Sequence, residues 1–297
     1  MTIDDAKQRL DAAAAPRFLL NDARVHVSPE GFHFIEHLDP PLPKERQVAA
    51  LAAADIAYIE RTLHANSARF SQHLALVGSC RPLQGARILD VGCGGGAFLS
   101  LARSAGSICT GLEVNPVRVA YSRERARLDV RFQTIDEFVS DGTQRGNFDV
   151  VTLWDVIEHV NEPFRTLECA VQALRPGGVL LIDTPARDSF YHRLGELSYH
   201  ASRGRVPLFL NSLYSSQPFG HKQIFSTTEM RQMLQRLRLG NIWIQKFHEF
   251  SFPVEHELER LVRSRAFARA MAPTARLLQR VIPIANKMLA IARAEPA

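Results

Sequence analysis

The sequence has little cysteine and no long hydrophobic run, and both features limit the class of protein that it can encode. The four cysteines, Cys80, Cys93, Cys109 and Cys169, lie far apart and form no C-x-x-C pair. Free thiols in a reducing compartment fit this spacing better than disulfides or a zinc site. No stretch approaches the roughly 18 consecutive apolar residues of a membrane span, and the acidic first residues lack the basic region of a signal peptide. We therefore expect a cytoplasmic location.

The positive charge of the sequence is not spread evenly along the chain. Its net charge is +5, but residues 254–297 hold eight Lys and Arg against four Glu, which accounts for +4. The rest of the chain is therefore nearly neutral. A protein that follows a nucleic-acid backbone carries a basic patch or stripe, so we expect no nucleic-acid partner.

Apolar runs of strand length alternate with helix-length segments between residues 67 and 185. This alternation is typical of βαβ units and predicts an α/β fold, a mostly parallel sheet with helices on both faces. The turn Arg175-Pro176-Gly177-Gly178 ends one of the helices. The expected strands are Ala86–Val91, Ile108–Val114, Val130–Thr134, Phe148–Trp154 and Val179–Thr184, and the expected helices are Phe98–Ala105, Pro116–Arg127 and Pro163–Leu174.

Segments on both sides of this core extend it. Residues 1–66 are expected to form a helical extension or cap that includes an Ala-rich helix near 47–63. Residues 186–225 are an aromatic-rich insertion, which at this length is more often a lid or binding wall than an idle loop. A helix over Thr227–Arg238 and a strand over Asn241–Phe250 then follow, so the predicted domain spans 67–253 and shows no evident seventh strand.

The last segment, 254–297, is predicted to be a basic helical extension. It contains no acidic residue between Arg260 and Ala294, and apolar residues recur through it, interrupted by Pro273 and Pro283. These apolar positions predict packing against the body of the protein or against a partner subunit in a homodimer. The alternative is a helix that lies on an anionic membrane surface as a peripheral contact.

A glycine-rich run, Ile88-Leu89-Asp90-Val91-Gly92-Cys93-Gly94-Gly95-Gly96, follows the first core strand and precedes a helix. Glycines let the backbone turn sharply and approach a ligand without a Cβ clash. In an open α/β sheet such a loop lies at the carboxyl end of its strand, where ligands bind. Glu113 ends the next strand, nineteen positions after Gly94, and a carboxylate there accepts hydrogen bonds from ribose hydroxyls.

Two nucleotide ligands fit the glycines alone, because Gly92-x-Gly94-x-x-Ala97 also matches the dinucleotide fingerprint of nicotinamide enzymes. Asp90 separates them. Its carboxylate would repel a pyrophosphate, whereas a sulfonium donor with an amino-acid tail offers an ammonium group to it. The run Leu89–Gly96 resembles the first motif of class I methyltransferases, which use S-adenosylmethionine.

That resemblance implies a Rossmann-like fold and several further roles, and it covers residues 66–185 with specific motifs and 219–250 more loosely. Glu113 matches the ribose-binding position and is followed by Val114, and Ile135 and Asp136 fall where such enzymes contact the adenine ring. Leu153 and Trp154 end the strand that leads to the transfer site. Together the implied donor-binding residues are Asp90, Gly92, Cys93, Gly94, Glu113, Val114, Ile135, Asp136, Leu153 and Trp154.

The segment after the fourth core strand, Asp155-Val156-Ile157-Glu158-His159-Val160, is similar to the ubiquinone-type O-methyltransferases and their relatives. His159 is a candidate general base, since an imidazole titrates near neutrality, and the competing interpretation is a structural histidine. The acid-acid-histidine set Asp155, Glu158 and His159 binds a divalent cation in some relatives. Magnesium is therefore an alternative here, but no metal is assigned.

His221 is the second candidate base, within Phe219-Gly220-His221-Lys222-Gln223-Ile224-Phe225-Ser226. Relatives carry a similar His-x-x-x-Phe-Ser stretch before the last helix. Ser226 or Thr227 is expected to cap that helix, with Glu229 close to a capping-box position. Part of the stretch is thus structural, and a contact of His221 with substrate is the other interpretation.

Methylation motifs for macromolecules are missing. No N/D-P-P-Y/F segment for amino methylation of bases follows the fourth core strand, and no Pro-Cys nucleophile for cytosine C5 chemistry or paired-glutamate loop for arginine methylation occurs. We therefore expect a small-molecule acceptor methylated on oxygen, such as a phenol, quinone or sugar. One alternative is a protein that binds the donor without catalysis. A more remote alternative is a nicotinamide-dependent oxidoreductase.

Overall fold

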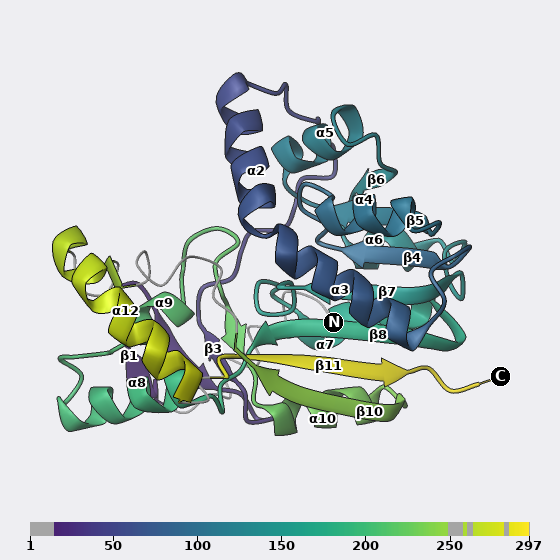
Figure 1. Cartoon of the computed structure of the whole chain (residues 1–297). Helices are drawn as coiled ribbons and strands as arrows, with labels where there is room; N and C mark the ends of the chain where they lie inside the picture. Colours follow the sequence, from purple (N-terminus) through teal and green to yellow (C-terminus); the bar gives the residue numbers. More distant parts are fainter. Residues whose placement is uncertain (1–14, 249–257, 260–263, 282–284, 297) are drawn as a thin grey trace.

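A seven-stranded sheet forms the centre of the protein (Figure 1). The computed structural model describes residues 15–248, 258–259, 264–281 and 285–296. Strand order is β10-β11-β8-β7-β4-β5-β6, and the β8-β7-β4-β5-β6 part is parallel. The strands are β4 (Arg87–Val91), β5 (Ile108–Glu113), β6 (Val130–Phe132), β7 (Phe148–Trp154), β8 (Leu174–Pro185), β10 (Gly240–Phe247) and β11 (Lys287–Arg293). The predicted Rossmann-like α/β fold, with its mostly parallel sheet, is confirmed.

Side chains of the central strands point alternately to the two faces of the sheet, and they form one apolar core layer on each face. Val150 and Trp154 of β7 face one cluster, while Val151 and Leu153 face the other. Successive side chains of a strand point to opposite faces, and a parallel sheet covered on both sides therefore reads as a continuous apolar run. One face is covered by α3 (Ser67–Cys80), α4 (Ala97–Ser104) and α5 (Pro116–Glu124), the other by α6 (Ile135–Ser140), α7 (Pro163–Ala173) and α10 (Thr227–Arg236).

Side-chain caps define where helices α5 and α10 begin. Asn115 accepts hydrogen bonds from the backbone N–H groups of Val117 and Arg118 at the start of α5, which has proline at its first position. At α10, Ser226 and Glu229 form the predicted capping box, in which each side chain satisfies an otherwise orphaned N–H of the first turn. The end of the insertion is thereby held at a defined place on the sheet.

A seventh strand is present, and the expectation that none follows β10 was wrong. Lys287–Arg293 forms β11, which is inserted antiparallel between β8 and β10. The buried positions Met288, Ala290 and Ala292 alternate with more exposed ones, which is a strand period that a short, uniformly apolar run conceals. Residues 254–297 are therefore not a purely helical extension: helix α12 (Arg265–Val281) precedes a strand of the main sheet.

The N-terminal region and the insertion build a second, smaller sheet, which the sequence did not reveal. Strands β1 (Phe18–Leu19), β2 (Arg24–Val27) and β3 (His33–Ile35) pair antiparallel, and β9 (Gln223–Ile224) of the insertion completes the sheet beside β3. Helices α8 (Phe190–Ala201) and α9 (Leu210–Leu213) belong to the same insertion. The described part of 1–66 is thus only partly helical, with α2 (Ala53–Ala65) as its helix.

Buried aromatic and histidine side chains fill this smaller module. The hydroxyl of Tyr214 lies 3.2 Å from Nδ1 of His33 and 3.1 Å from Nε2 of His192. Burial lowers the pKa of His33 to about 2 and of His192 to about 3, so both imidazoles are neutral. The insertion therefore packs with the N-terminal strands around a shared core rather than forming a loose loop, and its action as a lid stays a prediction.

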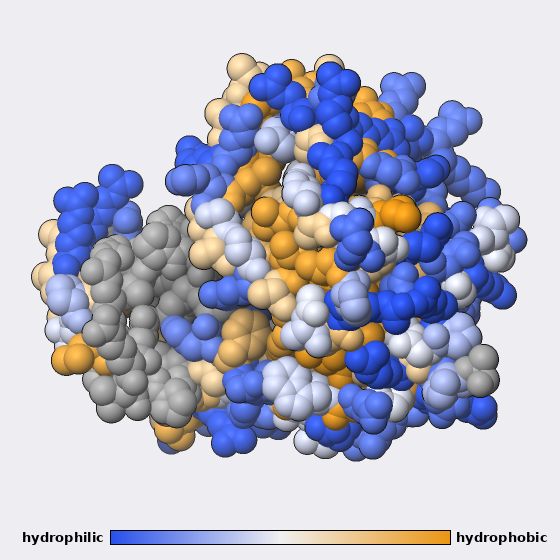
Figure 2. All heavy atoms as spheres, turned by 45° about the vertical axis from the view of Figure 1, so that its right-hand side comes forward, coloured by the Kyte–Doolittle hydropathy of each residue, from blue (hydrophilic) through white to orange (hydrophobic). Residues whose placement is uncertain are grey.

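Among the residues that the structure describes, no helix is both long and apolar enough to cross a bilayer. Figure 2 shows a hydrophobic area near the middle of one face, bordered by hydrophilic residues.

Candidate active site

The glycine loop lies between β4 and α4 and is shaped for a ligand. Gly92 and Gly94 have φ of +69° and +57°, a region that L side chains rarely adopt. A Cβ on Gly94 would meet nothing within 4 Å, whereas one on Gly92 would lie 2.6 Å from Cγ2 of Val156. The loop is therefore open at Gly94 and closely packed against the transfer segment at Gly92.

The two predicted acids lie on either side of this loop. Glu113 accepts hydrogen bonds from the backbone N–H groups of Gly94 (2.8 Å), Val114 (2.7 Å) and Asn115 (2.8 Å), so it holds the loop and the start of α5 together. Asp90 is buried at the end of β4 and accepts a hydrogen bond from Oγ1 of Thr152 at 2.6 Å.

The environment of Asp90 favours a cationic ligand. Burial raises its pKa to about 7, because a carboxylate loses hydration in the interior. A nearby ammonium group would stabilise the ionised form, whereas a pyrophosphate would be repelled by it. Together with the open position at Gly94, this fits S-adenosylmethionine, whose amino-acid tail carries such a group.

The other predicted donor-binding side chains differ in accessibility. Cys93, Ile135, Leu153 and Trp154 are buried, whereas Val114 is half-buried. The Trp154 ring stacks on His73 with ring centroids 3.9 Å apart. A buried side chain packs into the core, so a contact between these four residues and the donor stays a prediction and would use chiefly their backbone groups.

The carboxylate of Asp136 already contacts two other side chains. Its Oδ1 accepts a hydrogen bond from Nε of Arg165 at 2.8 Å, and Sγ of Cys169 lies 3.3 Å away. Burial raises the pKa of Asp136, but these contacts with Arg165 and Cys169 outweigh it and lower the pKa overall. A contact between this carboxylate and the adenine ring stays a prediction, and it would have to compete with Arg165.

Helix α2 lies over the glycine loop, a contact that sequence patterns did not reveal. A Cβ on Gly95 would lie 3.0 Å from Cγ2 of Ile59 and 3.2 Å from Cδ2 of Leu63. Both apolar residues are on α2, at the i, i+4 spacing of one helix face. That spacing was visible in the sequence, but nothing there indicated which surface the face would cover.

Asp155 follows β7 and lies in a buried network of charges rather than in an open metal site. Its side chain forms ion pairs of 2.5 Å with Arg69 of α3 and with Lys287 of β11. Its backbone N–H donates to Oδ1 of Asp183 at 2.7 Å, and its φ is +53°. Positive φ is uncommon outside glycine, and the surrounding bonds hold it here. Lys287 was missed because β11 was not predicted, and Arg69 because no local pattern placed α3 beside Asp155.

Glu158, His159 and His221 come together beside this network. The ring centroids of the two histidines are 4.7 Å apart, and one ligand-type atom from each of the three residues lies within 4.8 Å of the others. Oε2 of Glu158 accepts from Thr184 at 3.0 Å, and burial raises the Glu158 pKa well above its ordinary value. The sequence-predicted histidines are thus brought together from segments about sixty residues apart.

The tautomer of His221 follows from its partner. Nδ1 of His221 lies 3.2 Å from the carbonyl oxygen of Leu213. Because a carbonyl only accepts, Nδ1 carries the proton and Nε2 carries the lone pair. Burial lowers the pKa of His221 to about 4 and also lowers the pKa of His159. Both imidazoles are therefore neutral near pH 7.

Asp39 holds the segment that carries His221. Its Oδ1 lies 3.0 Å from Nζ of the buried Lys222, and its Oδ2 accepts from the backbone N–H of Phe219 at 3.1 Å. Its backbone N–H and carbonyl bond to the side chain of Asn161 at 3.0 and 2.8 Å. Asp39 therefore ties the two histidine-bearing segments together.

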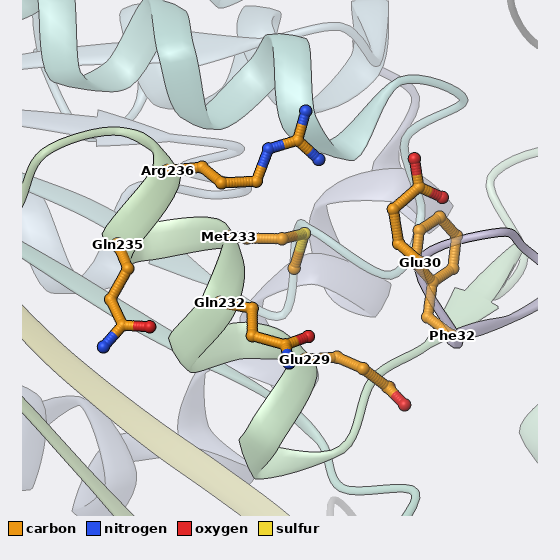
Figure 3. A pocket seen from close by; sticks show the side chains of 7 residues that line it. All are labelled: Glu30, Phe32, Glu229, Gln232, Met233, Gln235 and Arg236. Atoms are coloured by element: carbon orange, nitrogen blue, oxygen red, sulfur yellow. The ribbon is translucent and has the colours of Figure 1, made fainter.

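A hollow of about 340 Å³ lies elsewhere, between α10 and the segment before β3 (Figure 3). Figure 3 shows Met233 of α10 between Arg236 and Glu30. None of the predicted site residues lines it; its walls are Glu30, Phe32, Glu229, Gln232, Met233, Gln235 and Arg236. It is therefore separate from the glycine loop and from the histidine pair.

Comparison with known proteins agrees with this geometry. A family model described as a methyltransferase domain matches residues 58–242. A ubiquinone biosynthesis O-methyltransferase of Xanthomonas campestris is 33% identical over 131 residues, which covers 42% of this chain and 52% of that protein. The chain thus spans about half the length of the curated relative it matches.

Solved structures share the fold at low identity. An S-adenosylmethionine-dependent methyltransferase from Archaeoglobus fulgidus superposes with a TM-score of 0.53 at 17% identity, covering 80% of this chain and 98% of that one. A phosphoethanolamine N-methyltransferase of Haemonchus contortus, in complex with S-adenosylmethionine, gives a TM-score of 0.50 at 18% identity and covers 76% and 53%. With the family match over residues 58–242, the glycine loop and the strand order, the chain belongs to the class I S-adenosylmethionine-dependent methyltransferases.

Proposed function

We propose that this protein transfers the methyl group of S-adenosylmethionine to an oxygen atom of a small-molecule acceptor, such as a phenol, quinone or sugar. The observation that carries the proposal is the neutral His159–His221 pair. It joins the segment after β7, in which Val156 lies against Gly92 of the glycine loop, to the segment before β9. A hydroxyl acceptor needs a base for its proton, and a neutral imidazole is suited to that task. The O-methyltransferase name of the Xanthomonas relative supports the same choice.

The donor side of the site is assigned to the glycine loop and its two acids. Bound S-adenosylmethionine would supply a methyl group already activated by a sulfonium. Glu113 and the backbone around Gly94 would hold the ribose and the amino-acid tail, and Asp90 would meet the tail's ammonium group. Since the methyl group is activated in advance, the chain's main task is to position the acceptor and exclude water.

On the acceptor side, His221 is assigned as the base. Its Nδ1–H is fixed on the Leu213 carbonyl, which leaves the Nε2 lone pair to take the acceptor's proton. His159 lies beside it and would orient the same hydroxyl. Asp39 is a positioning residue in this scheme, because it holds the His221 segment through Lys222 and Phe219.

The magnesium alternative does not fit the observed side chains. Asp155, the first acid of the expected set, is paired with Arg69 and Lys287, so its negative charge is already balanced. Glu158 has a raised pKa and is bonded to Thr184, and the remaining neighbours are imidazoles. Magnesium prefers several oxygen ligands, and we assign it no role in the reaction.

Replacing Glu113 with alanine should weaken donor binding. The change leaves three backbone N–H groups without their acceptor and removes the proposed ribose partner, a loss of about 1–3 kcal/mol or roughly 5- to 150-fold in Kd. Calorimetric titration with S-adenosylhomocysteine measures it. Glu124→Ala, an exposed acid at the end of α5, is the matched control and should bind as the wild type does. Unchanged affinity in Glu113→Ala would remove this residue from the donor site.

A screen of acceptors tests the reaction itself. Purified protein is incubated with S-adenosylmethionine and panels of phenols, quinones, sugars, amines and thiols, and S-adenosylhomocysteine is measured with mass analysis of the product. We expect methylated oxygen acceptors. Turnover confined to amines or thiols would overturn the oxygen assignment. Tight binding of S-adenosylhomocysteine without turnover on any panel would favour a donor-binding protein without catalysis, and binding of NADH in its place would favour the oxidoreductase.

A further inference from the structure

Helix α12 is amphipathic in a way that its place in the fold does not explain. Over Arg265–Val281 the basic residues Arg265 and Arg269 are one helical turn apart, and the apolar residues Phe267 and Met271 repeat at the same spacing on another side. The sequence continues the basic spacing with Arg276 and Arg280 and has no acidic residue in the whole helix. Charge and apolar surface are therefore separated along its length.

The apolar side of α12 is exposed to solvent. Phe267, Met271 and Leu277 are 52%, 39% and 61% exposed, whereas Ala268 and Ala272 are 1% and 2% exposed. Among the side chains of α12 that the structure describes, the small Ala268 and Ala272 thus face the protein, and the large apolar ones point outward. Figure 1 draws it at the margin of the molecule, opposite α5 and β6.

The charges identify the kind of surface that would cover this helix. Arg265 is 81% exposed, and among the described residues it pairs with the partly exposed Glu259 at 2.7 Å; an exposed ion pair of this kind is weak. Arg269 is exposed as well. A helix with large apolar residues on one side and arginines on another matches a boundary where an apolar layer meets negative head groups.

We propose that α12 docks the protein onto an anionic lipid surface, with Phe267, Met271 and Leu277 inserted at the head-group boundary and the arginines beside the lipid phosphates. This docking is independent of the proposed reaction, because none of these residues belongs to the donor or acceptor site. The apolar side supplies contact with the bilayer, and the arginines make binding depend on lipid charge.

Vesicle flotation with the full chain tests the proposal. Vesicles of phosphatidylcholine alone are compared with vesicles containing phosphatidylglycerol, at low and at physiological salt. We expect binding to the anionic vesicles, weaker binding as salt rises, and little binding to the neutral ones. Arg265→Gln/Arg269→Gln should lower the partition coefficient by about 30-fold, since each basic residue near the surface contributes about fivefold.

Two further variants make the outcome specific. Phe267→Ser/Leu277→Ser should also lose vesicle binding, while Arg61→Gln/Arg125→Gln removes two exposed arginines from α2 and the end of α5 and should bind as the wild type does. Circular dichroism and S-adenosylhomocysteine binding check that each variant is folded. The proposal is overturned if the wild type does not float with anionic vesicles, if all variants float equally, or if Phe267→Ser/Leu277→Ser changes only a wild-type dimer into a monomer.

Discussion

His221→Ala should lower turnover by about 10²-fold or more, because a positioned general base contributes roughly 10²- to 10⁴-fold to a proton transfer. The loss is expected in kcat, since Nε2 of His221 acts on the proton as the acceptor is methylated. Removing the imidazole also leaves the Leu213 carbonyl without this hydrogen bond. Steady-state kinetics with a hydroxyl acceptor found in the screen measures the change, and donor affinity should stay within threefold of the wild type.

Three controls keep this prediction specific. His200→Ala replaces an exposed histidine of α8 and should leave kcat unchanged. His159→Ala should also slow the reaction, and the double variant should be little slower than His221→Ala, because residues that act as one unit are not additive. A loss smaller than threefold in His221→Ala would return this histidine to a structural role.

The pH profile gives a second readout for the same residue. The base must be neutral to accept a proton, and burial lowers the pKa of His221 to about 4. Activity should therefore persist as pH falls from 7 to 5 and decline only near pH 4. An acid limb close to 6.5, the value of an unperturbed imidazole, would indicate a base that is more exposed than His221.

Asp183→Asn should lower the free energy of unfolding by about 3–5 kcal/mol, the usual cost of removing one partner from a buried ion pair. The Asp183 side chain is fully buried and lies 2.9 Å from Arg69, 3.1 Å from His73 and 3.3 Å from Lys287. Asparagine keeps the volume but removes the charge. The cations Arg69 and Lys287 would then lose one carboxylate partner at a site away from bulk water and keep their ion pairs with Asp155.

Urea denaturation followed by circular dichroism measures this loss. Asp129→Asn makes the same substitution in the exposed pair with Arg131 and should change stability by at most about 0.5 kcal/mol. Burial alone would raise the Asp183 pKa, but Lys287, His73 and Arg69 outweigh it and hold the pKa below its usual range. The stabilisation should therefore be present above about pH 4 and decline on further acidification. A loss below 1 kcal/mol would show that the network rearranges around a neutral side chain.

The main α/β domain could be predicted because its signals are local. Turn glycines at Gly92 and Gly94, the acid Glu113 at a strand end, and the cap formed by Ser226 and Glu229 each depend on a few neighbouring residues. Backbone conformation and strand alternation at these places follow from residue type. The two histidines were also found individually, although their distance from one another was unknown.

What the sequence could not supply were the contacts between distant segments. Strand β11 was missed because a short apolar run reads equally well as helix or strand, and its antiparallel place between β8 and β10 is a tertiary choice. With β11 missing, Lys287 could not be placed beside Asp155 and Asp183. The pairing of β3 with β9 likewise joins residues almost two hundred positions apart, a separation that no local pattern encodes.

The sequence by itself determined the fold class and the glycine loop, since both arise from short-range backbone requirements that residue type expresses directly. Only the tertiary structure decided the chemistry around that loop. It placed Ile59 and Leu63 over Gly95, paired Asp155 with Arg69 and Lys287, and brought His159 to His221. The electrostatic surroundings, burial and pKa of these side chains depend on which distant groups become their neighbours. Those neighbours are decided by tertiary packing.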